Sequence, residues 1–203
     1  MNESFNNLSI FNRIKRASYT FGSSMVLASS FGKYSSALLH LTKQVIPNIK
    51  VLFIDTGFHS METYLNRKNL EKSLNLDVID YSARRSIKMQ RVLYGDDLLS
   101  ENNFERTRKE NKIEPFDRGL FDLEVHACLS GVMRWESKER QDFQFVKKRG
   151  GVYMIYPILD WEEKDILQYI ESHSLPMNNF YNDVFKGKDQ KLECGLHEHG
   201  SGI

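Results

Sequence analysis

The stretch Met25-Val-Leu-Ala-Ser-Ser-Phe-Gly-Lys-Tyr-Ser-Ser36 decides the fold class of this chain. It begins with a short apolar run, typical of a buried strand, which stops at a turn containing Gly32. Residues 33–44 then place apolar side chains at helical spacing. A strand, a glycine turn and a helix in this order predict the opening unit of an α/β domain.

The same alternation continues toward the C-terminus. Because strands that alternate with helices pair in parallel through right-handed crossovers, we expect an open, mostly parallel twisted α/β sheet with helices on both faces. Residues 83–113 are charged and only partly periodic, and Pro115 stands where a helix would start. Beyond Pro176 the periodicity is lost, so residues 1–176 are predicted to form the α/β domain and 177–203 a loose C-terminal tail. Strands are predicted at 51–54, 77–81, 126–130 and 151–157, and helices at 62–74, 116–123 and 160–172.

Composition limits the partners of the chain. Its 203 residues suffice for one domain with a substantial core. The 28 basic and 27 acidic residues give a net charge of +1, which calls for neither a nucleic-acid nor an acidic-membrane partner. No stretch approaches the ~20 apolar residues of a membrane span, and the first ten residues do not resemble a secretory signal. We therefore expect a cytoplasmic protein.

The two cysteines, Cys128 and Cys194, have different surroundings. They are too few for an iron–sulfur cluster and too isolated for a structural zinc site, so neither group is expected. Cys128 lies in an apolar strand, where a cysteine packs as a small hydrophobic residue. Cys194 lies in Glu-Cys-Gly-Leu-His, close to His197, and a nearby histidine can lower the pKa of a thiol. Cys194 is therefore the candidate nucleophile.

Two polar segments follow predicted strands, where parallel sheets bind ligands. Ser29-Ser-Phe-Gly-Lys-Tyr-Ser-Ser36 offers hydroxyls and backbone N–H groups at a helix N-terminus, which favours an anion site, although its spacing is not that of a Walker loop. A serine-rich helix cap is the alternative interpretation. Asp55-Thr-Gly57 could accept hydrogen bonds from a ribose or an adenine, or could simply form a turn.

Two basic runs, Lys112-Ile-Glu-Pro-Phe-Asp-Arg118 and Arg134-Trp-Glu-Ser-Lys-Glu-Arg140, complete the candidates. Arginine presents a planar, permanently charged fork that suits phosphate or sulfate. Either run alone could equally be a solvated face. Their position near predicted strand ends favours an anion site.

Taken together, these residues resemble the phosphoadenylyl-sulfate (PAPS) reductase family, which has an adenine-nucleotide hydrolase-like fold. The resemblance covers about residues 15–203 and departs from the family at three places. Met133 and Trp135 stand where the family usually has an arginine and a polar residue, and the segment 178–191 before the cysteine is short. The motifs that carry the resemblance are Ser-Ser-Phe-Gly at 29–32, Leu39-His-Leu41, Asp55-Thr-Gly57, Glu62-Thr-Tyr64, Tyr94-Gly95, Lys112-Ile-Glu-Pro115, Gly131 with Arg134, Ser137 and Arg140, Pro157-Ile-Leu-Asp-Trp161 and Glu193-Cys-Gly-Leu-His197.

The resemblance implies an activity in assimilatory sulfate reduction and cysteine biosynthesis. Cys194, with His197 nearby, would attack the sulfur of PAPS, and reduced thioredoxin or glutaredoxin would release sulfite. The resemblance also suggests a homodimer without a bound cofactor, and the paired cysteines of adenylyl-sulfate (APS) reductases are missing, which favours PAPS. The implied substrate-binding residues are Ser29, Ser30, Phe31, Gly32, Ser35, Asp55, Thr56, Gly57, Lys112, Gly131, Arg134, Ser137 and Arg140.

Other functions are compatible with the same residues. The chain could be a diverged reductase acting on APS, or a nucleotidyl or sulfur transferase that uses Cys194 as a sulfur carrier. It could also be a catalytically weakened nucleotide-binding protein. Turnover of PAPS, APS or ATP separates these hypotheses.

Overall fold

The computed structural model describes residues 3–186 and Leu196. Within them, six strands form one sheet in the order β3-β2-β1-β4-β6-β5. Neighbouring strands are parallel except for β5, which runs antiparallel to β6. The predicted open, mostly parallel sheet is therefore confirmed. The strands are β1 (Met25–Ala28), β2 (Lys50–Asp55), β3 (Asp77–Ser82), β4 (Ala127–Ser130), β5 (Val146–Arg149) and β6 (Val152–Ile155).

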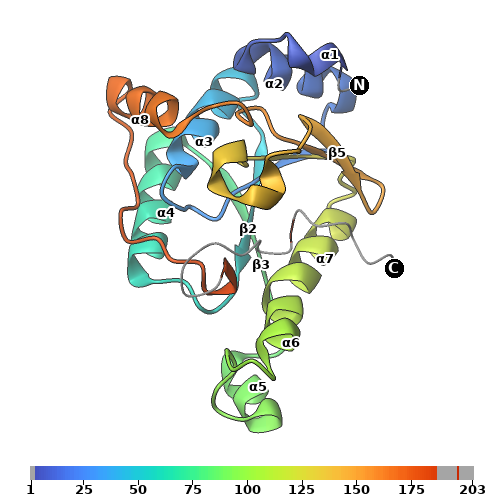
Figure 1. The fold of residues 1–203 in the computed structure, drawn as a ribbon, viewed down its shortest axis with the longest axis vertical. Coiled ribbons are helices and arrows are strands. Elements are labelled where there is room, and N and C mark those ends of the chain that lie inside the picture. The colour runs from blue at the N-terminus through green and yellow to red at the C-terminus, as the bar shows by residue number, and fades with distance from the viewer. Residues whose placement is uncertain (1–2, 187–195, 197–203) are drawn as a thin grey trace.

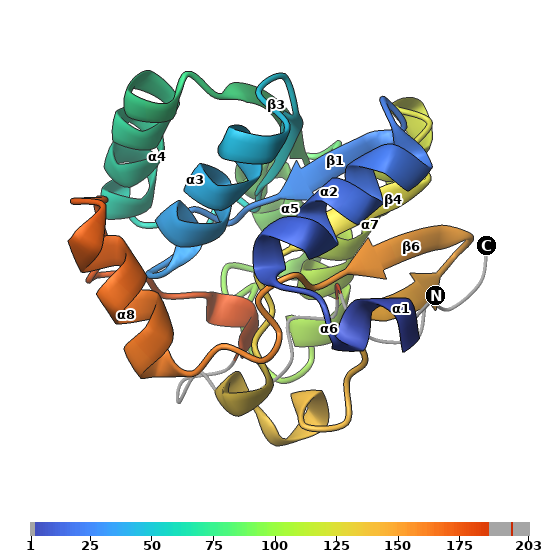
Figure 2. The same cartoon turned by 90° about the horizontal axis from the view of Figure 1, so that it is seen from above.

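The central strands are continuous apolar runs because the sheet is covered on both faces. Leu27 of β1 pairs with Val51 of β2 on one side and Leu129 of β4 on the other, and all three are almost fully buried. Helices α3 (Ser35–Val45), α4 (Met61–Leu74) and α8 (Glu163–Ser172) lie on one side of the sheet, and α7 (Glu114–Asp122) lies on the other (Figures 1 and 2). This arrangement confirms helices on both faces.

Residues 83–113 are more helical than the sequence analysis predicted. They include α5 (Ile87–Tyr94), α6 (Phe104–Arg108) and a π-helical turn (Lys109–Ile113) that runs without a break into α7. Pro115 stands in the first turn of α7, as predicted, but α7 continues a helix that begins upstream at Phe104. Proline lacks an N–H and crowds the carbonyl four residues earlier, and the wider π turn directly upstream accommodates both effects.

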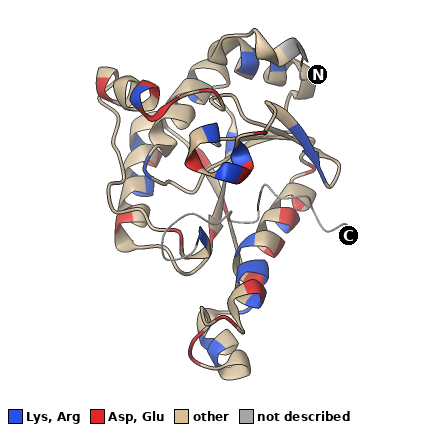
Figure 3. Cartoon of the chain, viewed as in Figure 1, with Lys and Arg blue, Asp and Glu red and all other residues tan. Residues whose placement is uncertain are grey.

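The periodicity of this helical rod is hidden by charge. Lys and Arg alternate with Asp and Glu along α6 and α7 (Figure 3), and they pair within the helix, as Arg118 does with Glu114. Such pairs stabilise an exposed helix. In addition, α7 buries Phe116 and Leu120, in the region where a helix was predicted at 116–123, whereas α6 has no such apolar stripe. The edge strand β5 was missed for a similar reason, because its sequence, Val-Lys-Lys-Arg, is charged. Gly150 and Gly151, both at positive φ, make the tight turn into β6.

Two N-terminal helices, α1 (Glu3–Asn6) and α2 (Ile10–Phe21), were not predicted. Arg13 of α2 is buried and forms a two-pronged ion pair with Asp160, at 2.7 and 2.8 Å. It also donates to the carbonyl of Pro157 at 2.8 Å and to that of Phe5 at 3.2 Å. This guanidinium therefore fixes the corner that follows β6.

The chain after α8 is irregular, as expected, but its first part is packed. Asn178, Asp183 and Phe185 are buried, and the segment ends in a 3-10 turn, η4 (Val184–Lys186). The remainder of the predicted tail, residues 187–195 and 197–203, lies outside the described residues, and so do Cys194 and His197.

Candidate functional site

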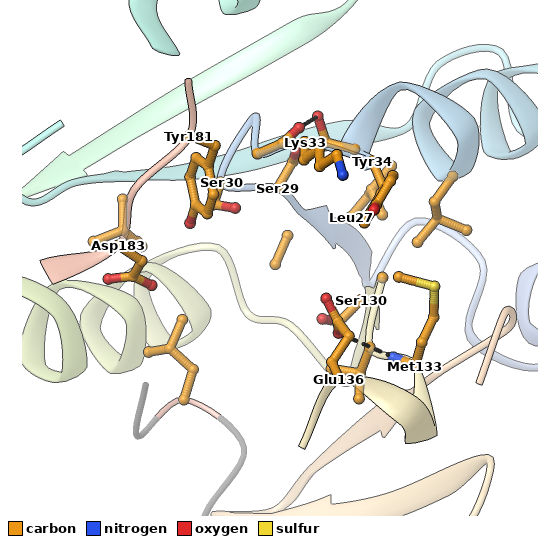
Figure 4. A pocket seen from close by; sticks show the side chains of 18 of the residues that line it. Leu27, Ser29, Ser30, Lys33, Tyr34, Ser130, Met133, Glu136, Tyr181 and Asp183 are labelled. Atoms are coloured by element: carbon orange, nitrogen blue, oxygen red, sulfur yellow. Dashed lines mark hydrogen bonds between the residues drawn. The ribbon is translucent and has the colours of Figure 1, made fainter. Parts of the chain in front are cut away.

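A cavity of about 400 Å³ opens at the carboxyl ends of β1 and β4. The strand order reverses between these two strands, which is the place where open α/β sheets bind their ligands. Ser29 and Ser30 line one side of it with Lys33, and Ser130 and Glu136 lie across from them (Figure 4). The cavity is therefore the candidate site for an anionic ligand.

Phe31 anchors the loop after β1 in the hydrophobic core. This residue is fully buried and meets Phe53 edge-on, with 5.5 Å between ring centroids. Its φ of 50° is unusual for a bulky side chain, and its carbonyl accepts hydrogen bonds from the amides of Asn66 at 3.1 Å and Asn178 at 3.3 Å. The ring and these two bonds stabilise a turn that leaves Gly32 and the serines facing the cavity.

The N-terminus of α3 borders the cavity with Lys33, Tyr34 and Ser35. Ser35 caps the turn by donating its hydroxyl proton to the carbonyl of Gly32 at 2.9 Å. The unpaired N–H groups at a helix start carry partial positive charge, which attracts anions. Lys33 adds a full charge at the rim, where it lies 3.5 Å from Glu163.

The buried cations of the cavity already have carboxylate partners. Lys112 pairs with Asp183, and both residues are only 6% exposed. Arg140 pairs with Glu136, whose carboxylate also accepts the backbone N–H of Met133 at 3.3 Å. Burial raises the pKa of Asp183, but the Lys112 charge outweighs it, so this pKa lies below its ordinary value. The cavity therefore holds positive and negative charge in adjacent pairs.

His59 contributes a neutral ring to the same lining. Its Nε2 donates to the carbonyl of Ile54 at 3.0 Å, which assigns the proton to that nitrogen. Burial is the main cause that lowers the pKa of His59 below its ordinary value. The ring is therefore uncharged at neutral pH and supplies no further cation to the cavity.

The turn after β2 uses Asp55 for its own structure. The Asp55 carboxylate accepts the N–H of Gly57 at 2.9 Å and the hydroxyl of Tyr64 at 2.7 Å. Gly57 has a φ of 73°, and a Cβ atom there would lie 2.9 Å from Ile87 Cγ1. Thr56 does line the cavity, so this turn reaches it through one residue of the three predicted.

Arg134 turns away from the main cavity. Its Nη2 donates to the carbonyl of Phe143 at 3.0 Å, and its guanidinium lies 5.3 Å from the ring centre of Phe145. It borders a second cavity, of about 300 Å³, together with Trp135 and Trp161. Trp135 lines both cavities and meets Tyr34 edge-on at 6.0 Å.

Cys128 cannot serve as a nucleophile. It lies in β4 and is fully buried, and burial raises its pKa to about 12. It therefore remains a protonated thiol at neutral pH, whereas nucleophilic attack requires the thiolate.

Comparison with known proteins places this geometry in a family. Residues 24–187 match the family model described as the phosphoadenosine phosphosulfate reductase domain. The chain belongs to this family. A phosphoadenosine 5′-phosphosulfate reductase of Synechococcus sp. is 38% identical over an alignment of 208 positions, gaps included, which covers 91% of this chain and 90% of that protein. One of Vibrio parahaemolyticus is 32% identical over 97% of this chain and 86% of its own length. The expected family resemblance is confirmed.

Solved structures agree on the fold of this PAPS reductase family member. The PAPS reductase of Candida auris superposes with a TM-score of 0.76 at 23% identity, over 87% of this chain and 85% of that one. The FMN adenylyltransferase of Candida glabrata superposes with a TM-score of 0.63 at 13% identity, over 87% and 64%. At these identities the likeness concerns the fold alone.

Some of the predicted substrate-binding residues of this PAPS reductase family member line the main cavity and others do not. Their role in binding stays a prediction. Phe31 lies beneath the loop, while Asp55, Gly57, Arg134 and Ser137 are outside the lining of the main cavity. Cys194 and His197 are beyond the described residues. The predicted residues that line the cavity together are Ser29, Ser30, Gly32, Ser35, Thr56, Lys112, Gly131 and Arg140.

Several lining residues were not predicted. Lys33, Tyr34 and Glu136 lie inside the motifs that were quoted, so the sequence offered a signal for them. Leu196 likewise lies in the quoted motif Glu193-Cys-Gly-Leu-His197. Residues 178–186 contribute further lining residues that no local pattern marks, namely Tyr181, Asp183 and Lys186.

The described part of the chain, residues 3–186 and Leu196, lacks two features. No group of three or more His, Cys, Asp or Glu side chains is arranged there to hold a metal ion. No helix in that part of the chain is both long and apolar enough to cross a bilayer.

Proposed function

We propose that this chain reduces PAPS to sulfite and adenosine 3′,5′-bisphosphate, with reduced thioredoxin or glutaredoxin as the electron donor. It is an oxidoreductase of the PAPS reductase kind. The observation that carries the proposal is the cavity at the β1–β4 switch point, lined by a serine–glycine loop and by buried cations. Such a site suits a ligand with several phosphate and sulfate groups.

The substrate would lie with its anionic groups between the loop and the buried cations. Ser29, Ser30 and Gly32 would donate hydrogen bonds from the loop, and the start of α3 would add its dipole. Lys112 and Arg140 would supply charge from the opposite side. The same cations would stabilise the negative charge that develops on the leaving group during attack.

In the proposed reaction, the Cys194 thiolate attacks the sulfur of PAPS. A bond forms between Sγ and that sulfur, and the bond from the sulfur to the phosphate oxygen breaks. Adenosine 3′,5′-bisphosphate leaves with the electron pair, and the enzyme is left as a cysteine S-sulfonate. A thiolate of the reduced donor then attacks Cys194 Sγ and expels sulfite, and the second donor thiol resolves the mixed disulfide.

Three observations support Cys194 in this role. The other cysteine, Cys128, is buried with a pKa of about 12. Leu196, two residues after Cys194 in the sequence, lines the cavity. Lys186 also lines it and precedes Cys194 by eight residues, a length that spans at most roughly 26–29 Å when extended. The short segment is therefore long enough for the thiol to reach the substrate, and His197 would keep that thiol ionised.

The decisive experiment follows sulfite release from PAPS in the presence of reduced thioredoxin, with APS assayed in parallel. We expect turnover by the wild type and its loss in Cys194→Ser, while Cys128→Ser remains active as the matched control. Without a donor, the wild type should accumulate the S-sulfonate, visible by intact mass spectrometry. Undiminished sulfite release by Cys194→Ser would refute the mechanism.

The setting of the reaction is part of the proposal. A thiol mechanism requires a reducing compartment, which is consistent with the cytoplasm. The homodimer suggested by the resemblance stays a prediction, and light scattering of the purified chain checks it.

A further inference from the structure

One wall of the cavity is a strap formed by residues 178–186. Asn178 donates to the carbonyl of Phe31 at 3.3 Å and to Thr63 Oγ1 at 3.2 Å, which attaches the strap to the loop after β1. The ring of Tyr181 packs against Gly32, where an added Cβ atom would lie 3.1 Å from the ring. Tyr181 and Asp183 together border one end of the cavity (Figure 4).

The strap inserts a negative charge into a site that is suited to anions. Asp183 and Lys112 form an ion pair, each is 6% exposed, and both line the cavity. The second carboxylate oxygen of Asp183 accepts the backbone N–H of Phe185 at 3.1 Å. The carboxylate thus occupies the position at Lys112 that a phosphate or sulfate oxygen would take.

The two partners differ in how firmly they are held. Lys112 belongs to the π turn inside a continuous helix, with Asn111 and Gln90 joined by two side-chain hydrogen bonds directly behind it. Asp183 belongs to a segment whose regular structure is a single 3-10 turn. A second anion at Lys112 would face a like charge in a poorly solvated site, which is unfavourable unless the carboxylate withdraws. Asp183 is the partner that can move.

We infer that Asp183 is an internal counter-ion of Lys112 that the anionic substrate displaces, which makes it a positioning residue. In the ligand-free protein its carboxylate pairs with the charge of the buried Lys112. When a phosphate or sulfate binds, Lys112 exchanges the Asp183 carboxylate for the anion of the ligand. The strap, which leads toward Cys194, then loses its ion pair with Lys112. The inference rests on the proposed function only for the identity of the natural anion.

The test is a double-mutant cycle of Asp183→Asn and Lys112→Met, measured by calorimetric binding of adenosine 3′,5′-bisphosphate and of inorganic sulfate. Neither ligand is turned over, so binding is independent of Cys194. We expect Asp183→Asn to tighten binding of both roughly tenfold, a common size for coupling between competing interactions. Lys112→Met should weaken binding and should abolish the gain in the double variant.

The matched control is Asp117→Asn. Asp117 lies in α7 and pairs with the buried Arg149 of β5, and neither residue lines the cavity. Asp117→Asn also removes one negative charge and breaks one ion pair. Because it does so away from the cavity, both affinities should be unchanged. The inference is overturned if Asp183→Asn binds the anions no more tightly than the wild type, or if it binds neither of them. It is also overturned if the gain in affinity persists in the double variant that lacks Lys112. If the proposed function alone is wrong, sulfate affinity will still change as expected across the variants of the cycle, but the wild type will release no sulfite from PAPS.

Hydrogen exchange gives a second measurement. The N–H of Phe185 is bonded to the Asp183 carboxylate, so its exchange reports whether that carboxylate stays in place. We expect the bisphosphate to accelerate exchange at Phe185 in the wild type. Slower or unchanged exchange at saturating ligand would contradict displacement.

Discussion

The left-handed backbone at Phe31 predicts a reversal of the usual order of two substitutions. Phe31 is fully buried, and replacing a buried phenylalanine by alanine costs about 3–5 kcal/mol of unfolding free energy. Alanine keeps a Cβ atom and therefore keeps the strain of a φ of 50°. Glycine removes the same ring and also this strain, so Phe31→Gly should be about 1 kcal/mol more stable than Phe31→Ala.

Phe53 supplies the matched control. It is also fully buried and contacts Phe31, but it lies in the middle of β2, and its backbone is not among those at positive φ. In a strand, glycine is less stable than alanine by about 0.5–1 kcal/mol. Phe53→Gly should therefore unfold more readily than Phe53→Ala, which is the opposite order to that at position 31.

The assay is equilibrium unfolding in urea, followed by circular dichroism. With a slope of about 2 kcal/mol per molar, a difference of about 1 kcal/mol moves the midpoint by about 0.5 M. The alanine and glycine variants at one position should share the same slope, so the midpoints can be compared directly. A lower midpoint for Phe31→Gly than for Phe31→Ala would show that the loop is not held in the left-handed conformation.

Three further predictions concern other buried groups. Arg13→Ala should lower the unfolding free energy by about 2–3 kcal/mol, because Asp160 and two backbone carbonyls lose a buried donor. A loss below about 0.5 kcal/mol in urea would place this ion pair among ordinary surface pairs. Cys128 should resist iodoacetamide in the native Cys194→Ser protein and react only in urea, because its pKa of about 12 leaves little thiolate; rapid native labelling would refute its burial. His59 has a folded pKa below its unfolded value near 6.5, so stability is fully present above that pH and is lost as pH falls. His59→Asn should lose less stability than the wild type between about pH 7.5 and 5, and equal losses in urea melts would contradict the assignment.

Local patterns in the sequence were sufficient to predict the sheet, apart from its edge strand β5, and one wall of the site. The apolar run of β1, the turn at Gly32 and the spacing of α3 are each encoded within a few residues. Because parallel strands end at one edge, the loops after β1 and β4 could be expected to meet, and both line the cavity. A charged helix such as α6 shows no apolar stripe, so it could not be recognised in the same way, whereas most of α7 was predicted.

Side-chain direction and distant contacts could not be predicted. Arg134 follows β4 as expected, but a sequence does not tell whether its guanidinium points to the cavity or to the carbonyl of Phe143. The strap is the clearer case, because its burial depends on partners far away in the chain. Asn178 contacts Phe31, 147 residues earlier, and Asp183 pairs with Lys112, 71 residues earlier. Its polar composition suggests a loose tail, and such long-range contacts make it a wall.

The segment before Cys194 can be short because the strap, residues 178–186, already forms one wall of the cavity. In the proposed mechanism the thiol must reach the cavity from the last fixed point of the chain, and Lys186 is already at the cavity. The eight residues from Lys186 to Cys194 therefore need only cross it. A longer tether would not help the thiol to reach the cavity. Doubling the length of a flexible loop costs about 0.6 kcal/mol, which lowers the effective concentration of the thiol roughly threefold. What a longer segment could add is contacts to the substrate, and here Tyr181 already borders that end of the cavity. The strap therefore accounts for a short tether that is still compatible with the chemistry.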